Sequence, residues 1–331
     1  MSWSRAAQSQ GDHSMVPIFL LTGAVILVTA FALTPSAQPS NRLPRRALNR
    51  SDQTFSSSDL SPTDLGPETD PSTSAPAGPP TQWTPFSAAA YAKDSKYHLL
   101  LCATGSVAAI KIPAICAALS TYSNLAVRVL LSQSATRFLD GQSAEQPHWS
   151  TLTEIKNVMG VYVDRYEWSK PWQRGDDILH IELRRWADLM VVAPLSANAL
   201  AKMANGLSDN LVMSVIRAWD TTGQIDGVRP GVALEGGAEK KRITVAPAMN
   251  TAMWRHPVTM KHLRVLVDEW GVENGGWVEL LQPIEKGLAC GDAGSGGMKE
   301  WKTIVGDIER NFPRLKRDEA AEREGSQGEE E

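Results

Sequence analysis

Three side chains could move protons or hold a carboxylate. His180 begins the segment HIELRRWAD, and an imidazole titrates near neutral pH, so it could accept a proton where it faces a pocket. Asn250, in PAMNTAMW, carries an amide that can donate to and accept from a substrate. Cys290 lies in GLACGDAGSGGM, where glycines would let a flap close and bring an accessible thiol over a site. His180 and Cys290 also have structural interpretations: a packed histidine, and a flexible loop with an incidental cysteine.

Three turns rich in small polar residues, TGSVAA, SQSATRF and PLSANA, each follow an apolar run. Gly105 in the first permits a tight turn, and the free N–H groups of a helix start favour a phosphate. The hydroxyls of Ser132 and Ser134 could bind a phosphate or a sugar-like chain, and Ser196 and Asn198 could bind the polar edge of a flat ring. The alternative is that these residues only cap helices.

The apolar runs predict the elements that must position these residues. A helix is expected over residues 110–120, and short runs rich in β-branched residues are expected to be strands. The predicted strands are 97–103, 125–131, 188–193, 243–246 and 277–281. Strands that alternate with helices indicate an α/β fold, a parallel sheet with helices on both faces. Ligands bind beyond the carboxyl ends of such strands, which places Gly105, Ser132, Ser196 and Ala248 on one rim.

Composition narrows the classes of function. With 42% hydrophobic and 21% charged residues, the 331-residue chain can form a sizeable core. A net charge of −4 argues against a nucleic-acid-binding protein, which would show a basic face. Three cysteines without CxxC spacing favour reduced thiols, and we expect Cys102 and Cys116 to lie in the core. Six scattered histidines without an HExxH motif make a zinc site improbable.

The chain divides into four regions. Residues 1–34 contain an uncharged run, 15–33, that is long enough to span a bilayer. A membrane anchor, a signal peptide and a tolerated extension all remain open for it, and arginines after the run favour a cytoplasmic domain if it is an anchor. Residues 35–94 are rich in Ser, Thr and Pro and predict a disordered linker. A folded domain is expected over 95–315, and a solvated charged tail over 316–331.

The order of these motifs, HIELRRWAD, APLSAN, DN, RAWD, PAMN and ACGD, resembles the phosphopantothenoylcysteine decarboxylases, a family of flavin-dependent cysteine decarboxylases. The resemblance covers roughly residues 97–298. It implies a Rossmann-like, flavodoxin-related fold of three layers, assembled as a homotrimer that binds FMN at subunit contacts. It also implies decarboxylation of 4′-phosphopantothenoyl-L-cysteine to 4′-phosphopantetheine in coenzyme A biosynthesis, through thioaldehyde and enethiolate intermediates.

The resemblance assigns roles residue by residue. His180 matches the active-site histidine and Cys290 the flap cysteine. Asn250 matches the residue that holds the substrate carboxylate, and Gly287 and Ala289 fall where the flap touches substrate. Relatives commonly have lysine at position 287, whereas here Lys286 is adjacent. The residues that match FMN-binding turns are Gly105, Ser106, Val107, Ser132, Gln133, Ser134, Ser196, Ala197, Asn198, Ala199 and Ala248.

Other functions remain open at this point. A flavin prenyltransferase or a peptidyl-cysteine decarboxylase would keep the fold, although a prenyltransferase has no need of the Cys290 flap. Some fungal relatives are phosphatase-inhibiting subunits or members of hetero-trimers with paralogues. This chain carries His180, Asn250 and Cys290 together, so it needs no complementing subunit. A membrane-tethered binding protein rests only on residues 15–33.

Overall fold

The computed structural model describes residues 87–287 and 293–318 of the chain. Six strands form one parallel sheet in the order β3-β2-β1-β4-β5-β6, and two further strands form a separate antiparallel hairpin. The strands are β1 (Tyr97–Ala103), β2 (Leu125–Leu131), β3 (Val158–Val163), β4 (Leu189–Leu195), β5 (Arg242–Pro247), β6 (Val278–Leu280), β7 (Ile284–Gly287) and β8 (Ala293–Gly297). A sheet that starts at its centre and extends in both directions is the doubly wound Rossmann order, which confirms the predicted fold class.

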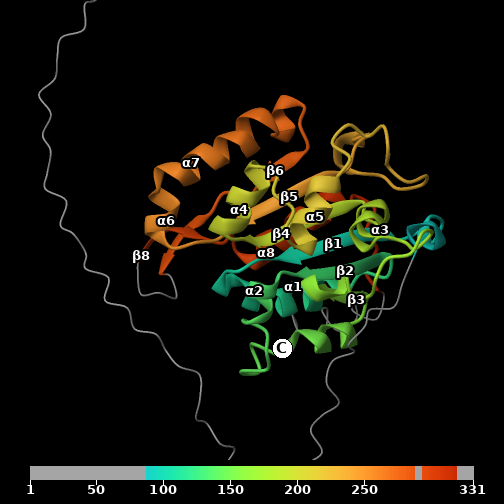
Figure 1. The fold of residues 1–331 in the computed structure, drawn as a ribbon, viewed down its shortest axis with the longest axis horizontal. Helices are drawn as coiled ribbons and strands as arrows, with labels where there is room; N and C mark the ends of the chain where they lie inside the picture. Colours follow the sequence, from blue (N-terminus) through green and yellow to red (C-terminus); the bar gives the residue numbers. More distant parts are fainter. Residues whose placement is uncertain (1–86, 288–292, 319–331) are drawn as a thin grey trace, which may run out of the picture. The chain divides into compact units, whose positions relative to one another are not determined.

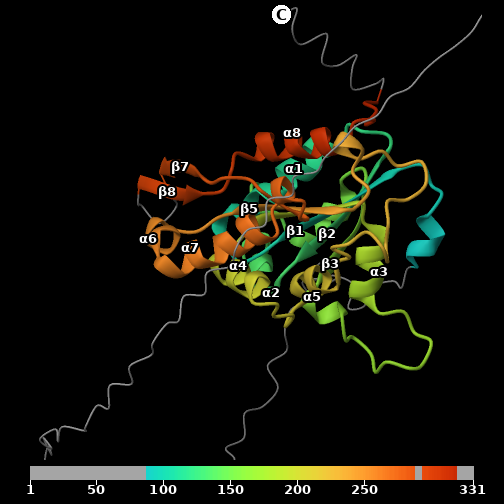
Figure 2. The same ribbon diagram turned by 90° about the horizontal axis from the view of Figure 1, so that it is seen from above.

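Helices cover both faces of the sheet, which gives three layers. In Figures 1 and 2, α1 and α8 lie on one face and α3, α4, α5 and α7 on the other. The helices are α1 (Ile112–Leu119), α2 (Gln133–Thr136), α3 (Leu179–Trp186), α4 (Ala197–Ala204), α5 (Leu211–Ala218), α6 (Thr251–Arg255), α7 (Pro257–Arg264) and α8 (Trp301–Asn311). Short 3-10 turns join these elements, and α7 continues as a π-helical turn, Val265–Glu269.

The core lies between these layers. Every residue of β1, β2 and β4 is buried, because each of these strands has a neighbour on both sides and helices on both faces. Leu99 of β1 pairs with Val127 of β2 and with Leu189 of β4, which fixes the register at the centre. Helix α3 buries Leu179, Leu183 and Trp186, spaced to lie on one side of a helix.

Most predicted elements are present. The predicted helix over 110–120 begins as a 3-10 turn, Val107–Lys111, and continues as α1 to Leu119. Strand β3 was not predicted, because Met159 is exposed and Gly160 interrupts the apolar pattern at this edge of the sheet. The segment expected to be a glycine-rich flap is in part the hairpin β7–β8, which lies beside α6 in Figures 1 and 2.

Residues on both sides of the predicted range 95–315 make contacts with the domain. The 3-10 helix Ala88–Tyr91 packs against α3, where the Ala88 N–H donates to Glu182 at 2.7 Å. At the other end the Asp318 N–H donates to the Thr121 carbonyl at 2.8 Å, so residues 316–318 are packed as well. Residues 15–33 lie outside the described residues, and within 87–287 and 293–318 no helix is long and apolar enough to cross a membrane.

Candidate functional site

Hydrogen bonds join the strand ends into one continuous rim. After β1, the Thr104 hydroxyl donates to the Pro194 carbonyl at 2.9 Å and accepts from the Ser196 N–H at 2.7 Å. The Ala248 N–H, after β5, donates to the Leu195 carbonyl at 3.0 Å. Thr104 is buried and was not among the predicted site residues. It holds the turns after β1 and β4 together, as the predicted rim requires.

Asp164 performs the same task on the other side of the rim. It follows β3, and its carboxylate accepts from the Gln133 N–H at 2.6 Å and from the Leu211 N–H at 3.2 Å. Burial raises the pKa of Asp164, although both N–H donors act in the opposite direction. The residue therefore joins the turn after β2 to the start of α5. Sequence reasoning missed Asp164 because the strand before it was not recognised.

A pocket of about 380 Å³ opens at this rim. It brings together six predicted residues, Ser132, Gln133, Ser134, Ser196, Asn198 and Ala199. The other lining residues are Thr104, Arg137, Asp164, Lys202, Asp209 and Asn210. Lys202 is paired with Asp209 at 2.6 Å, whereas the exposed Arg137 forms no ion pair with any residue that the structure describes. Hydroxyls, amides and one free cation suit a ligand that carries hydroxyl and phosphate groups.

The capping interpretation holds for three of the candidates. Ser132 and Ser196 each accept from a backbone N–H three residues on at 3.3 Å, and they begin α2 and α4. Asn250 Oδ1 accepts from the Met253 N–H at 2.8 Å and begins α6. A cap uses one side-chain acceptor and leaves the hydroxyl hydrogen or the amide NH₂ group available. Capping and ligand binding are therefore compatible at these positions.

Gly105 allows two turns of the rim to approach each other. A Cβ atom at this position would lie 2.5 Å from the Ser134 hydroxyl oxygen, closer than real Cβ contacts. The neighbouring Ser106 and Val107 begin the 3-10 turn that leads into α1, and Val107 is exposed. These residues of the first predicted FMN turn border the pocket through Ser134, and they are not among its lining residues.

His180 is held by a buried carboxylate. It lies in the first turn of α3, and its Nδ1 is 2.6 Å from Glu167 Oε1. Glu167 is 5% exposed, and its second oxygen has no hydrogen-bond partner among the described residues. Because a carboxylate only accepts, Nδ1 carries the hydrogen and Nε2 of the neutral ring is left as a proton acceptor. Glu167 belongs to no motif, and only the fold shows its role.

The hairpin β7–β8 is fastened to the element that carries Asn250. The Met249 N–H donates to the Gly296 carbonyl at 2.9 Å, and a Cβ at Gly294 would lie 2.6 Å from the Thr251 hydroxyl. Gly287 ends β7 and pairs with Ala293. Of the predicted flap residues, Ala289 and Cys290 lie outside the described residues.

The other two cysteines are in the core, as predicted. Cys102 lies in β1 and Cys116 in α1, and both are free and buried. Burial raises the pKa of Cys102 well above its usual value and that of Cys116 to about 12. Neither thiol is suited to proton transfer near neutral pH.

Within a single chain, the predicted site residues do not all line the rim pocket. Ser132, Ser134, Ser196 and Asn198 surround the rim pocket, whereas His180 and Asn250 are not among its lining residues. Ala197 lies at the start of α4, next to the pocket residues Ser196 and Asn198.

Comparison with known proteins identifies the family. A model of the flavoprotein family matches residues 87–312. A probable phosphopantothenoylcysteine decarboxylase of Arabidopsis thaliana is 44% identical over 213 residues, 64% of this chain and 87% of that protein. Coenzyme A biosynthesis protein 3 of Saccharomyces cerevisiae is 36% identical over 249 residues, 73% of this chain and 38% of that protein. A probable thymidylate synthase of Schizosaccharomyces pombe is 45% identical over 216 residues, 65% of this chain, which spans only 29% of that protein's length.

A solved structure agrees with these sequences. It is a cysteine-to-serine mutant of PPC decarboxylase complexed with pantothenoylaminoethenethiol, with a TM-score of 0.50 and 41% sequence identity. The match covers 65% of this chain and 97% of that one. The chain therefore belongs to the flavoprotein family and, within it, to the phosphopantothenoylcysteine decarboxylases.

Proposed function

We propose that the chain decarboxylates 4′-phosphopantothenoyl-L-cysteine to 4′-phosphopantetheine with FMN as cofactor, in coenzyme A biosynthesis. The observation that carries the proposal is the polar pocket at the rim of the sheet, in a chain that covers 87% of a named decarboxylase at 44% identity. The expected cofactor-binding turns after β2 and β4 both line that pocket. A redox-active ligand at the switch point of a doubly wound sheet agrees with where such folds bind ligands.

The residues present suit FMN. Hydroxyls of Ser132 and Ser134 and the guanidinium of Arg137 would hold the ribityl and phosphate groups, and Ser196 and Asn198 would hold the ring edge. Gly105 keeps this side of the pocket free of a side chain. Bound FMN would supply reversible two-electron chemistry, so that the substrate carbon next to sulfur is oxidised before CO₂ leaves and reduced afterwards.

The protein's own contribution is to orient the substrate and to move protons. Asn250, whose Oδ1 is used in capping α6, would present its NH₂ group to the substrate carboxylate. His180 would accept a proton at Nε2 in the first half of the reaction, held in that form by Glu167. Cys290 would return a proton in the second half. This protonation would come after CO₂ has left the thioaldehyde, whose C=S group accepts the electron pair to give an enethiolate.

We infer that the chain acts as a homotrimer whose sites lie between subunits. Support comes from the separation described above: His180 and Asn250 do not line the rim pocket of their own chain. A His180→Asn variant and a Cys290→Ser variant, neither of which should form 4′-phosphopantetheine alone, should then recover part of that activity when co-expressed in one cell. Mixed trimers without recovered activity, or a chain that stays monomeric with FMN bound, would contradict the inference.

The activity is tested with the full chain and FMN. Visible absorbance should show one bound flavin per chain, and CO₂ should be released from phosphopantothenoylcysteine. His180→Asn should abolish CO₂ release and keep the flavin spectrum, and His262→Asn on α7 serves as the control histidine. A wild-type protein that binds FMN and releases no CO₂ would overturn the proposed activity, and one that remains colourless with added FMN would overturn the cofactor assignment.

A further inference from the structure

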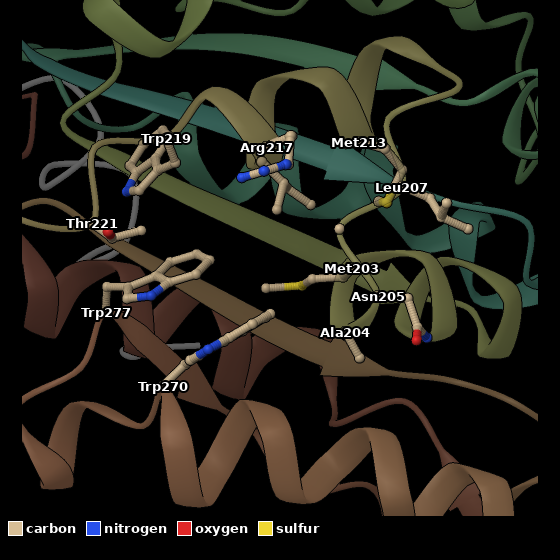
Figure 3. Close-up of a pocket in the computed structure, with 12 residues that line it drawn as sticks. Met203, Ala204, Asn205, Leu207, Met213, Arg217, Trp219, Thr221, Trp270 and Trp277 are labelled. Atoms are coloured by element: carbon tan, nitrogen blue, oxygen red, sulfur yellow. The ribbon is translucent and has the colours of Figure 1, made fainter.

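A second pocket, of about 420 Å³, lies away from the rim residues discussed so far. It is formed by the ends of α4 and α5 together with the segment from the π-helical turn to β6 (Figure 3). None of its lining residues lines the rim pocket or belongs to the predicted site. The residues that decide its chemistry are Met203, Asn205, Arg217, Trp219, Trp270 and Trp277.

One wall of this pocket is an indole pair. The rings of Trp270 and Trp277 stack with centroids 5.3 Å apart and an interplanar angle of 26°. The Trp277 N–H donates to the Trp270 carbonyl at 2.8 Å, and the turn between them is so tight that a Cβ at Gly276 would overlap that carbonyl. The tight turn holds the two residues close together, and their rings stack on each other to form an aromatic wall.

Further apolar side chains line the other walls of this second pocket. Trp219 is buried and its Nε1–H donates to the Lys241 carbonyl at 3.3 Å, so the ring cannot turn freely. Met203 is also buried, and Figure 3 shows its thioether pointing toward the two stacked indoles. Thioethers beside aromatic rings pack well against flat ligands. Flat aromatic and thioether surfaces suit a planar ring rather than a flexible chain.

The pocket also carries one uncompensated cation. Arg217 is exposed and forms no ion pair within residues 87–287 and 293–318, whereas Arg184, Arg229 and Arg310 each pair with a carboxylate there. Figure 3 places Arg217 across the cavity from Trp270 and Trp277. A guanidinium opposite aromatic rings suits an anion attached to a planar group.

We propose that this pocket binds a planar aromatic group bearing a negative charge, such as a nucleotide. The ligand ring stacks on the outer face of the stacked Trp270–Trp277 pair, and the anion pairs with Arg217. Asn205 also lines the pocket, and its NH₂ group donates to the Ala201 carbonyl at 2.7 Å. This inference goes beyond the proposed decarboxylase activity and does not depend on it.

The test uses the full chain loaded with FMN and then freed of excess flavin by gel filtration, so that the rim site is occupied and free flavin does not compete for the second pocket. Titration calorimetry with adenosine 5′-monophosphate should show one saturable site, with adenosine and inorganic phosphate each about tenfold weaker or more. Salicylate, a small aromatic acid, is titrated as a second ligand. Tighter binding of adenosine monophosphate than of salicylate indicates a nucleotide site, and tighter binding of salicylate indicates a site for aromatic anions in general. Both results support a ligand site in this pocket. Failure of both to bind at millimolar concentration would overturn the inference.

Variants assign the binding to this pocket. Arg217→Met removes the cation from an exposed position. It should weaken the binding of adenosine monophosphate about tenfold or more and leave the affinity for adenosine unchanged. Trp270→Leu should weaken the binding of both adenosine monophosphate and adenosine. An unchanged flavin spectrum shows that the variant is folded. Arg174→Met, at an exposed loop arginine, is the matched control. Binding that is unaffected by both Arg217→Met and Trp270→Leu would overturn the assignment.

Discussion

The carboxylate of Glu167 determines how His180 can act. It is buried, accepts from Nδ1 at 2.6 Å and leaves Nε2 as the only acceptor of a neutral ring. Partners of this kind orient a functional histidine and select its tautomer. The two residues are thirteen positions apart, on different elements, so their contact depends on the packing of α3 beside the turn after β3.

Glu167→Gln should lower turnover by about 10- to 100-fold without changing FMN affinity. The amide can donate as well as accept, so the ring is no longer held in one tautomer. Turnover, flavin binding and ¹⁵N NMR of the His180 ring measure the three effects separately. Glu154→Gln, at an exposed glutamate, should leave all three unchanged. Normal turnover with a mixed tautomer signal would show that the orientation of His180 is unimportant.

Gly105→Ala should weaken FMN binding, because the new Cβ would meet Ser134 at 2.5 Å and push that turn into the pocket. Overpacking of this kind costs about 1–3 kcal/mol. Adding Ser134→Gly removes the clashing atoms and should recover part of the affinity. Gly306→Ala on α8, where a Cβ meets open space, is the control. Flavin fluorescence quenching gives the dissociation constants, and an unchanged value for Gly105→Ala would exclude this turn from the cofactor site.

The contact between Glu167 and His180 shows the limit of sequence reasoning about the site. Ser132 and Ser196 follow recognisable apolar runs, so the shared rim of a parallel sheet placed them correctly in one pocket. Glu167 follows an edge strand with a broken apolar pattern, and no residue spacing connects it to His180. A contact between a helix residue and a distant turn becomes visible only after the fold is known.

At the scale of elements, strand β8 depends on glycine where it approaches α6. A Cβ at Gly294 would lie 2.6 Å from the Thr251 hydroxyl and 2.9 Å from its methyl group. We therefore expect Gly294→Ala to destabilise the fold by about 1–3 kcal/mol and to reduce turnover. Thr251 has a buried hydroxyl without a partner among the described residues, so Thr251→Ala costs little and should rescue Gly294→Ala. Urea unfolding with parallel activity assays tests both, and additive losses in the double variant would contradict the contact.

Helix α8 introduces a pH dependence through Asp307. Burial, with Glu279 nearby, raises the pKa of Asp307 from 3.8 to about 6. The folded state then binds a proton more readily than the unfolded state between about pH 4 and 6, so raising the pH through this range lowers stability. The contribution is on the order of 2–3 kcal/mol.

Asp307→Asn should remove that component. The free energy of unfolding of wild type minus that of the variant should fall as pH rises from about 4 to 6 and stay constant above it. Asp268→Asn, at an exposed residue, should give a flat difference. Urea denaturation across this pH range is the measurement. A difference that rises with pH would show that folding lowers the pKa of Asp307 instead of raising it.

The elements differ in how visible they are in the sequence. β1, β2 and β4 are mainly apolar runs, with His98 in β1 and Arg128 in β2 as exceptions, because both sheet faces are covered, and this pattern is easy to recognise. β8 reads AGSGG, a composition disfavoured in strands, and forms because its backbone pairs with β7 and fits against α6. Close backbone packing of this kind leaves no apolar periodicity to detect.

At the scale of the whole molecule, the order of strands explains why separate motifs share one pocket. The order reverses at β1, between β2 and β4, and the rim pocket lies where the turns after these strands meet. Apolar runs and helices predicted this architecture. The separation of His180 and Asn250 from this pocket within one chain was not predictable from their motifs, because it depends on where α3 and α6 pack in the fold.

The most direct test of the proposed chemistry is to identify the product made by wild type and by Cys290→Ser. Full-length protein with FMN is incubated with phosphopantothenoylcysteine, and the masses of the products are measured by mass spectrometry. Wild type should yield 4′-phosphopantetheine, lighter than the substrate by one CO₂. The variant should accumulate the decarboxylated enethiol, lighter again by two hydrogens, because the final proton is not supplied. Recovery of intact substrate from the wild-type reaction, in protein that has bound FMN, would contradict the account.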